Sequence, residues 1–252
     1  MRYKPLDSQS VATTQDLLPG GVDRHSHPSF LRHHFESVGQ QREAASFGMW
    51  IFLLTEIMFF GGLFCAYLIF RNWYHPAFVA GSNTLDITLG TTNTAVLIGS
   101  SFTMAMAVYS AEMRRRAQLI LFLSLTIVLG FAFLGIKAVE YHQKYTDHHI
   151  PGPNFSIQEF VHPSNPKAIP LSPDMAQKTQ IYFSLYFAMT GMHALHMIIG
   201  ISLLFFMVWR ASRNAYTEGH IMPVENFGLY WHFVDIVWIF LFPLLYLISR
   251  YR

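Results

Sequence analysis

The sequence predicts an all-α membrane protein whose chain crosses the bilayer several times. Charged residues make up only 13% of the 252 residues, about half of the ~25% that is usual in a soluble globular domain. Apolar residues make up 52% and the mean hydropathy is +0.29. Five apolar stretches are long enough to cross a bilayer, for which ~20 helical residues are needed. This composition argues against a soluble enzyme.

The five stretches are the predicted spans of a transmembrane bundle. In chain order they cover about 47–70, 89–111, 117–139, 181–209 and 228–249. The second is the least apolar, and its small residues, such as Ala95 and Gly99, indicate close packing against neighbouring helices. Residues 46–252 are thus expected to form one five-helix domain.

Two polar segments complete the predicted organisation. Residues 1–45 contain no long apolar run and are expected to form a polar tail on the inner side of the membrane. The connection 140–180 contains six prolines and is expected to be an extended strap on the outer side.

The distribution of Lys and Arg predicts the orientation. Ten of them lie on the side of the tail, against six on the opposite side, and the three consecutive arginines 114–116 give the strongest signal. The N-terminus is therefore expected inside and the C-terminus outside. The net charge of +2 provides no basic field for nucleic acid, and the single Cys65 excludes a disulfide framework.

Glu56 is the most informative polar residue at membrane depth. It lies about ten residues into the first span, ~15 Å along a helix, where an ionisable group is costly and needs a reason. One interpretation is a proton-handling group or a contact at a subunit interface. The other is a neutral carboxylic acid that donates one hydrogen bond to a facing helix.

Histidines and a further carboxylate form the second polar group. His193 and His196 share a helical face, and as metal or haem ligands they would need further partners, so hydrogen-bonded structural histidines are favoured. His232 and Asp235 are three residues apart on one helical face and could form a hydrogen-bonded pair.

Lys137 and Glu140 form another possible pair. No nucleophile–base set, phosphate loop or Cys/His cluster occurs, so the sequence predicts no catalytic residue, cofactor ligand or metal ligand on this chain. Near the inner interface, Arg210 is expected to contact a lipid headgroup, and Arg213 to be an ordinary interfacial arginine.

Five motifs occur in the order found in one known family. They are Gly48-Met49 with Thr55-Glu56-Ile57-Met58-Phe59-Phe60, Asn93-Thr94, Glu140-Tyr141, Gly191-x-His193-x-x-His196-x-x-x-Gly200, and Trp231-His232-Phe233-Val234-Asp235-Ile236-Val237-Trp238. The chain thereby resembles cytochrome c oxidase subunit III, with Ala194 in place of a family glycine. The resemblance spans about residues 47–250.

The resemblance implies a non-catalytic subunit of a haem–copper terminal oxidase in aerobic respiration. Haem and copper would lie on partner subunits I and II, which reduce oxygen and translocate protons, and this chain would stabilise subunit I, support proton uptake and bind phospholipid. Subunit IV or other respiratory complexes are further expected partners, in a bacterial cytoplasmic (inner) membrane.

The resemblance also implies roles for single residues. Glu56 matches the buried carboxylate at the subunit I interface, and Arg210 matches a lipid-headgroup contact. The positions with a structural role are His193, His196, Trp231, His232, Asp235 and Glu140.

The chain differs from the larger members of the family in its N-terminal region. Larger members have seven helices, and here the polar tail replaces the first two. Five-helix forms also occur in quinol oxidases, but Glu56 and Glu225 favour the cytochrome c branch. Two alternatives of another class are a b-type haem protein that uses His193 or His196 with His232, and a stand-alone proton transporter built around Glu56.

Overall fold

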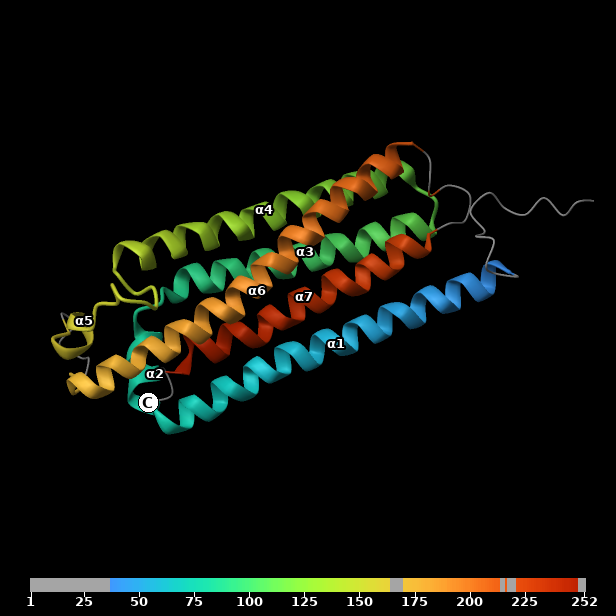
Figure 1. Ribbon diagram of the computed structural model, residues 1–252. Helices are drawn as coiled ribbons and strands as arrows, with labels where there is room; N and C mark the ends of the chain where they lie inside the picture. Colours follow the sequence, from blue (N-terminus) through green and yellow to red (C-terminus); the bar gives the residue numbers. More distant parts are fainter. Residues whose placement is uncertain (1–36, 164–169, 214–215, 217–220, 249–252) are drawn as a thin grey trace, which may run out of the picture. The chain divides into compact units, whose positions relative to one another are not determined.

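The structure, a computed structural model, describes residues 37–163, 170–213, 216 and 221–248, and all regular elements in these ranges are helices (Figure 1). Residues 1–41 and 42–252 form two separate units, and the second holds the features described below. The helices are α1 (Val38–Trp73), α2 (His75–Asn83), α3 (Ile87–Glu112), α4 (Arg116–Thr146), α5 (Gln158–Val161), α6 (Pro173–Ser212) and α7 (Met222–Tyr246).

Five of these helices, α1, α3, α4, α6 and α7, are long and apolar enough to cross a membrane. This confirms the all-α class and the five predicted spans. Most helices continue beyond those spans: α1 begins at Val38, inside the segment expected as a polar tail, and the rest of that tail, 1–36, lies outside the described residues. Polar helix ends can extend because beyond the hydrocarbon they meet water and headgroups.

The connection predicted as an extended strap over 140–180 is shorter than expected. Helix α4 continues to Thr146, α6 already begins at Pro173, and the short α5 lies between them. Two local signals explain the early start of α6. The Ser172 hydroxyl accepts a hydrogen bond from the Met175 amide, and Pro173 takes the first helical position, where its missing N–H costs nothing.

Helices α3, α4, α6 and α7 pack around one core, with α3 and α6 each against both α4 and α7. Trp231 and Trp238, on one face of α7, are fully buried in it. Glycines make room for the first ring, because a Cβ on Gly200 would lie 2.9 Å from Trp231 and one on Gly130 3.3 Å from it. The second ring packs edge-on against Phe133, at 4.9 Å between centroids.

Helix α1 contacts the other helices through one narrow stripe. Leu53, Phe60 and Tyr67 on this stripe are buried, whereas most other apolar residues of α1 are exposed. The Tyr67 hydroxyl donates a 2.5 Å hydrogen bond to the Leu244 carbonyl, in the last turn of α7. That carbonyl has no partner within its own helix, so α1 satisfies a group that would otherwise be orphaned.

Candidate functional site

The first polar site joins α1 to α6. His196 Nε2 lies 3.2 Å from Glu56 Oε2, and both side chains are largely buried, with 12% and 18% exposed. His196 Nδ1 is 2.8 Å from the Met192 carbonyl, one turn earlier on α6. Tyr230 of α7 donates a 2.8 Å hydrogen bond to the His196 carbonyl, and the Phe60 ring packs 5.5 Å from the imidazole.

The hydrogen-bond partners of His196 show which of its ring nitrogens carries a hydrogen. A carbonyl oxygen only accepts, so Nδ1 must carry a hydrogen that it donates to Met192. Nε2 and the Glu56 carboxyl then share one proton, held either as imidazolium and carboxylate or as imidazole and carboxylic acid. Glu56 thus makes a hydrogen bond to a facing helix, as one of its two interpretations predicted, and His196 is hydrogen-bonded.

The second polar site joins α4, α6 and α7. Lys137 Nζ donates to Glu140 Oε2 at 2.8 Å, to the Tyr246 hydroxyl at 3.1 Å and to the Tyr186 hydroxyl at 3.2 Å. Tyr246 in turn donates to Glu140 Oε1 at 2.5 Å. Lys137 and Glu140 are only 3% and 2% exposed. The predicted Lys137–Glu140 pair is therefore confirmed.

This network satisfies a fully charged pair. The three acceptors match the three hydrogens of an ammonium group, and Glu140 accepts on both oxygens. The Trp238 ring also lies 4.9 Å from Lys137 Nζ, which adds a cation–π contact. The sequence reasoning missed Tyr186 and Tyr246. The available signal was that a buried tyrosine needs a partner for its hydroxyl.

The predicted pair of His232 and Asp235 is wrong. His232 Nδ1 lies 2.7 Å from the Ser101 hydroxyl of α3, and Asp235 makes no hydrogen bond to His232. The cause is the strong attachment of α7 to α3, where Trp231 donates to Ser100 and places its neighbour His232 beside Ser101. Spacing along one helix does not reveal this competing partner.

His193 also differs from its prediction. Its ring packs between Phe133, at 5.3 Å, and Trp238, at 5.2 Å, and neither nitrogen has a hydrogen-bond partner among the described residues. It therefore lies in the apolar core, while His196 on the same helix contacts α1. The two histidines do not act together.

Two contacts between a basic and an acidic side chain lie near opposite ends of the helices. Arg42 of α1 donates to both carboxylate oxygens of Glu225, in the first turn of α7, at 3.0 Å. His149, in the loop after α4, lies 3.0 Å from Glu159. Burial lowers the pKa of His149 to about 4, and the positive charge of Lys144 acts in the same direction. The lowered pKa favours a neutral imidazole near neutral pH, so the contact with Glu159 is not an ion pair there.

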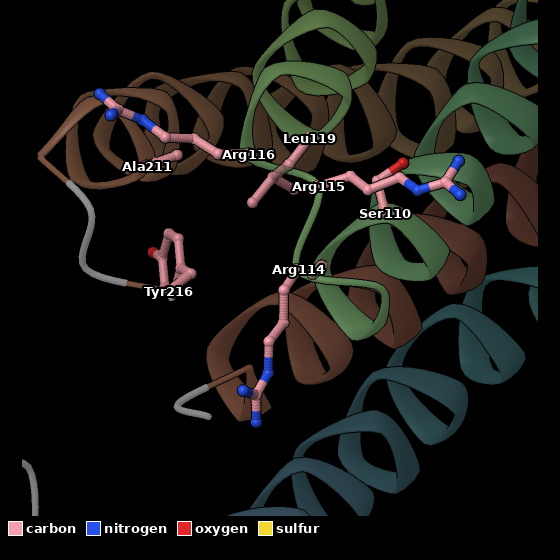
Figure 2. A pocket seen from close by; sticks show the side chains of 8 residues that line it. Ser110, Arg114, Arg115, Arg116, Leu119, Ala211 and Tyr216 are labelled. Carbon is pink, nitrogen blue, oxygen red and sulfur yellow. The ribbon is translucent and has the colours of Figure 1, made fainter. Parts of the chain in front are cut away.

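Arg210 lies at the end of α6 beside a small pocket. Its guanidinium packs over the rings of Phe206 and Tyr216, at 5.9 and 5.7 Å. Burial raises the pKa of Tyr216. The residues that line the pocket are Ser110, Ala111, Arg114, Arg115, Arg116, Leu119, Ala211 and Tyr216. Figure 2 shows the three arginines 114–116 pointing away from one another, so their charges do not converge inside it.

These features define a class of protein: a multi-pass helical membrane protein whose described polar groups mainly join its helices to one another. Comparison with known proteins gives the family. A family model described as cytochrome c oxidase subunit III matches residues 23–149 and 174–250. The chain belongs to the cytochrome c oxidase subunit III family, which confirms the resemblance in the five motifs.

Individual relatives agree. The cytochrome c oxidase subunit 3 of Struthio camelus is 32% identical over 227 residues, 86% of this chain and 74% of the relative. That of Gallus gallus is 33% identical over 227 residues, with the same coverage. That of Thermostichus vulcanus is 30% identical over 212 residues, 81% of this chain and 87% of the relative.

Family membership states the role of the chain in general terms. It is a non-catalytic core subunit of a haem–copper oxidase, part of a complex with subunits I and II. Subunit III itself lacks redox centres. The family assignment therefore favours the oxidase subunit over the two alternative interpretations, a b-type haem protein and a stand-alone proton transporter.

Proposed function

We propose that this chain stabilises subunit I of a cytochrome c oxidase and supports proton uptake by the complex. The observation that supports the stabilising role is that the charged side chains at membrane depth are paired with other groups of this chain. Lys137 and Glu140 of α4 form hydrogen bonds with Tyr186 of α6 and Tyr246 of α7. Glu56 of α1 contacts His196 of α6. Such groups hold a helix bundle in one geometry, which suits a subunit that braces a partner.

The proposal for proton uptake rests on the Glu56–His196 pair. The two groups share one proton and remain partly accessible, with 18% and 12% of their side chains exposed. A pair of this kind holds its proton without a net charge in the membrane, and it can take part in proton uptake by gaining one proton as it loses another. We place this site on the side of the chain that meets subunit I.

Phospholipid binding at Arg210 is a further part of the proposal. The aromatic contacts with Phe206 and Tyr216 hold the guanidinium at the end of α6, where the prediction puts the inner membrane surface. An arginine held there can bind a phosphate with two parallel hydrogen bonds. We therefore propose an anionic phospholipid headgroup as its ligand.

The proposal also covers the orientation of the chain in the membrane, the electron donor and the neighbouring subunits. The N-terminus lies inside and the C-terminus outside, in a bacterial cytoplasmic membrane, and the polar tail and the five-helix domain meet near residue 45. Cytochrome c is the electron donor of the complex, and subunit IV or other respiratory complexes are additional neighbours. The three arginines 114–116 support the orientation.

The experiment is purification of the complex through a tag on this chain in mild detergent. Haem and a large partner subunit should co-purify, and harsher detergent should remove both while this chain stays soluble and colourless. Glu56→Gln should shorten the catalytic lifetime of the complex or slow proton uptake with an unchanged haem spectrum. Thr55→Val, at an exposed neighbour on α1, is the matched control. A colourless chain without partners in every detergent would refute the proposal.

A further inference from the structure

His232 is a polar side chain that lies at membrane depth and is only partly buried. Its hydrogen-bond partner Ser101 lies twelve residues after the start of the expected span 89–111 and ten before its end, which places the pair ~15 Å from the nearer end of that span. At that depth it is far from both headgroup regions of a bilayer whose hydrocarbon core is ~30 Å thick. Its surroundings outside the chain are therefore hydrocarbon or another protein.

The hydrogen bonding of His232 is incomplete within this chain. Nδ1 pairs with the Ser101 hydroxyl at 2.7 Å. No described residue forms a hydrogen bond with Nε2, and the side chain is not enclosed by the bundle. The Glu56–His196 pair differs in this respect, because each of those groups finds its partner inside the chain.

Lipid cannot supply the missing bond. Acyl chains contain no donor or acceptor, and a polar group left unpaired in hydrocarbon costs several kcal/mol. A neighbouring transmembrane helix can supply it, through a side chain or a free carbonyl that faces Nε2. The partly buried imidazole therefore argues for protein rather than lipid on this face.

The surface beside His232 suits a helix. On α7, Leu229 and Ile236 share a face with His232 at helical spacing, and both are exposed. On α3, Ile98 is exposed and precedes Ser101 by one turn. Together these residues form an apolar surface around one polar point, which is defined here as the α3–α7 face.

We propose that the α3–α7 face is the docking surface for a transmembrane helix of the oxidase partner, which places a hydrogen-bonding group against His232 Nε2. This inference rests on the proposed function, in which the chain packs against a partner subunit. His232 acts as a recognition point at mid-membrane depth. The apolar residues around it supply the packing.

The first test is photo-crosslinking in the intact complex. A photoreactive amino acid replaces Ile236 on the α3–α7 face, or Val128 on α4 as the matched control, since both side chains are exposed, at 50% and 61%. Mass spectrometry identifies the adducts. The expected result is a polypeptide adduct with the partner from position 236 and phospholipid adducts from position 128. Phospholipid adducts alone, or no adduct, from position 236 would overturn the proposal.

The second test separates the outward bond of His232 from its inward one. His232→Leu removes both, His232→Gln keeps a polar group near the Nε2 position, and Ser101→Ala removes only the inward partner. Retention of the chain on the purified complex is measured over a detergent series. His232→Leu should weaken retention about tenfold, the effect of one hydrogen bond in a membrane, while the other two should stay near wild type. Equal loss for Ser101→Ala and His232→Leu would overturn the proposal.

The two proposals fail in different ways. If haem and partner co-purify with the chain but the partner adduct forms from position 128 instead of 236, the face is wrong and the proposed function stands. If no haem-bearing partner co-purifies with any variant, the proposed function itself is wrong.

Discussion

Replacing Glu140 by Gln tests whether the buried network of α4, α6 and α7 is held by charge. The substitution keeps the size of the side chain but leaves the Lys137 ammonium, 3% exposed, without a counter-ion. Its two other acceptors, the hydroxyls of Tyr186 and Tyr246, remain at 3.2 and 3.1 Å. They are neutral, so they cannot replace a carboxylate at 2.8 Å.

The magnitude follows from the burial of both partners. Removing one member of a buried ion pair usually costs ~3–5 kcal/mol, because the other charge stays buried and uncompensated. Removing both charges costs much less. We therefore expect Glu140→Gln to lower the free energy of unfolding by ~3 kcal/mol or more, and the double variant Lys137→Met/Glu140→Gln to recover most of that loss.

The assay is SDS-driven release and unfolding of this chain from the purified complex, with free-energy differences taken from midpoint shifts at a common slope. Glu112→Gln, at an exposed acid that ends α3, is the matched control and should change little. The reasoning would be refuted if Glu140→Gln cost less than ~1 kcal/mol, or if the double variant lost the sum of the two single effects.

Three further predictions concern backbone and pH. Gly81→Ala should destabilise the protein by ~1–3 kcal/mol, because the new Cβ would lie 2.4 Å from the Tyr182 ring. At Gly61 a Cβ meets no atom within 4 Å, so Gly61→Ala should be neutral or stabilising. Thermal melting that gives Gly61→Ala the lower melting temperature would contradict this. Arg114→Gly should raise the melting temperature by relieving the positive φ of 56° that follows α3, an effect of ~1 kcal/mol, and an unchanged or lower value would count against it. His149, with its pKa lowered to about 4 from 6.5, binds its proton more weakly in the folded state. The free energy of unfolding should therefore fall as the pH decreases from 6.5 towards 4, and unfolding measured across this range should show a smaller decrease for His149→Phe than for the wild type.

Much of the candidate site was predictable where one helix contains both partners. Lys137 and Glu140 are three residues apart on α4, and helical geometry alone brings such side chains together. The same rule failed for His232 and Asp235, because Ser101 on another helix offers His232 a bond at 2.7 Å. Local spacing defines which pairs are possible, and packing between helices decides which of them form.

What the sequence alone determined is the all-α class, the five membrane-length helices and the family, because apolar runs and short motifs are local properties of the chain. The tertiary structure alone decided that His196 pairs with Glu56, 140 residues away, while His193 lies between Phe133 and Trp238. The two histidines are three residues apart on one helix. The two side chains leave the helix at different angles around its axis, so that His196 faces α1 and His193 faces the core. Which group each side chain meets depends on where the neighbouring helices lie, and the sequence of one helix does not contain that information.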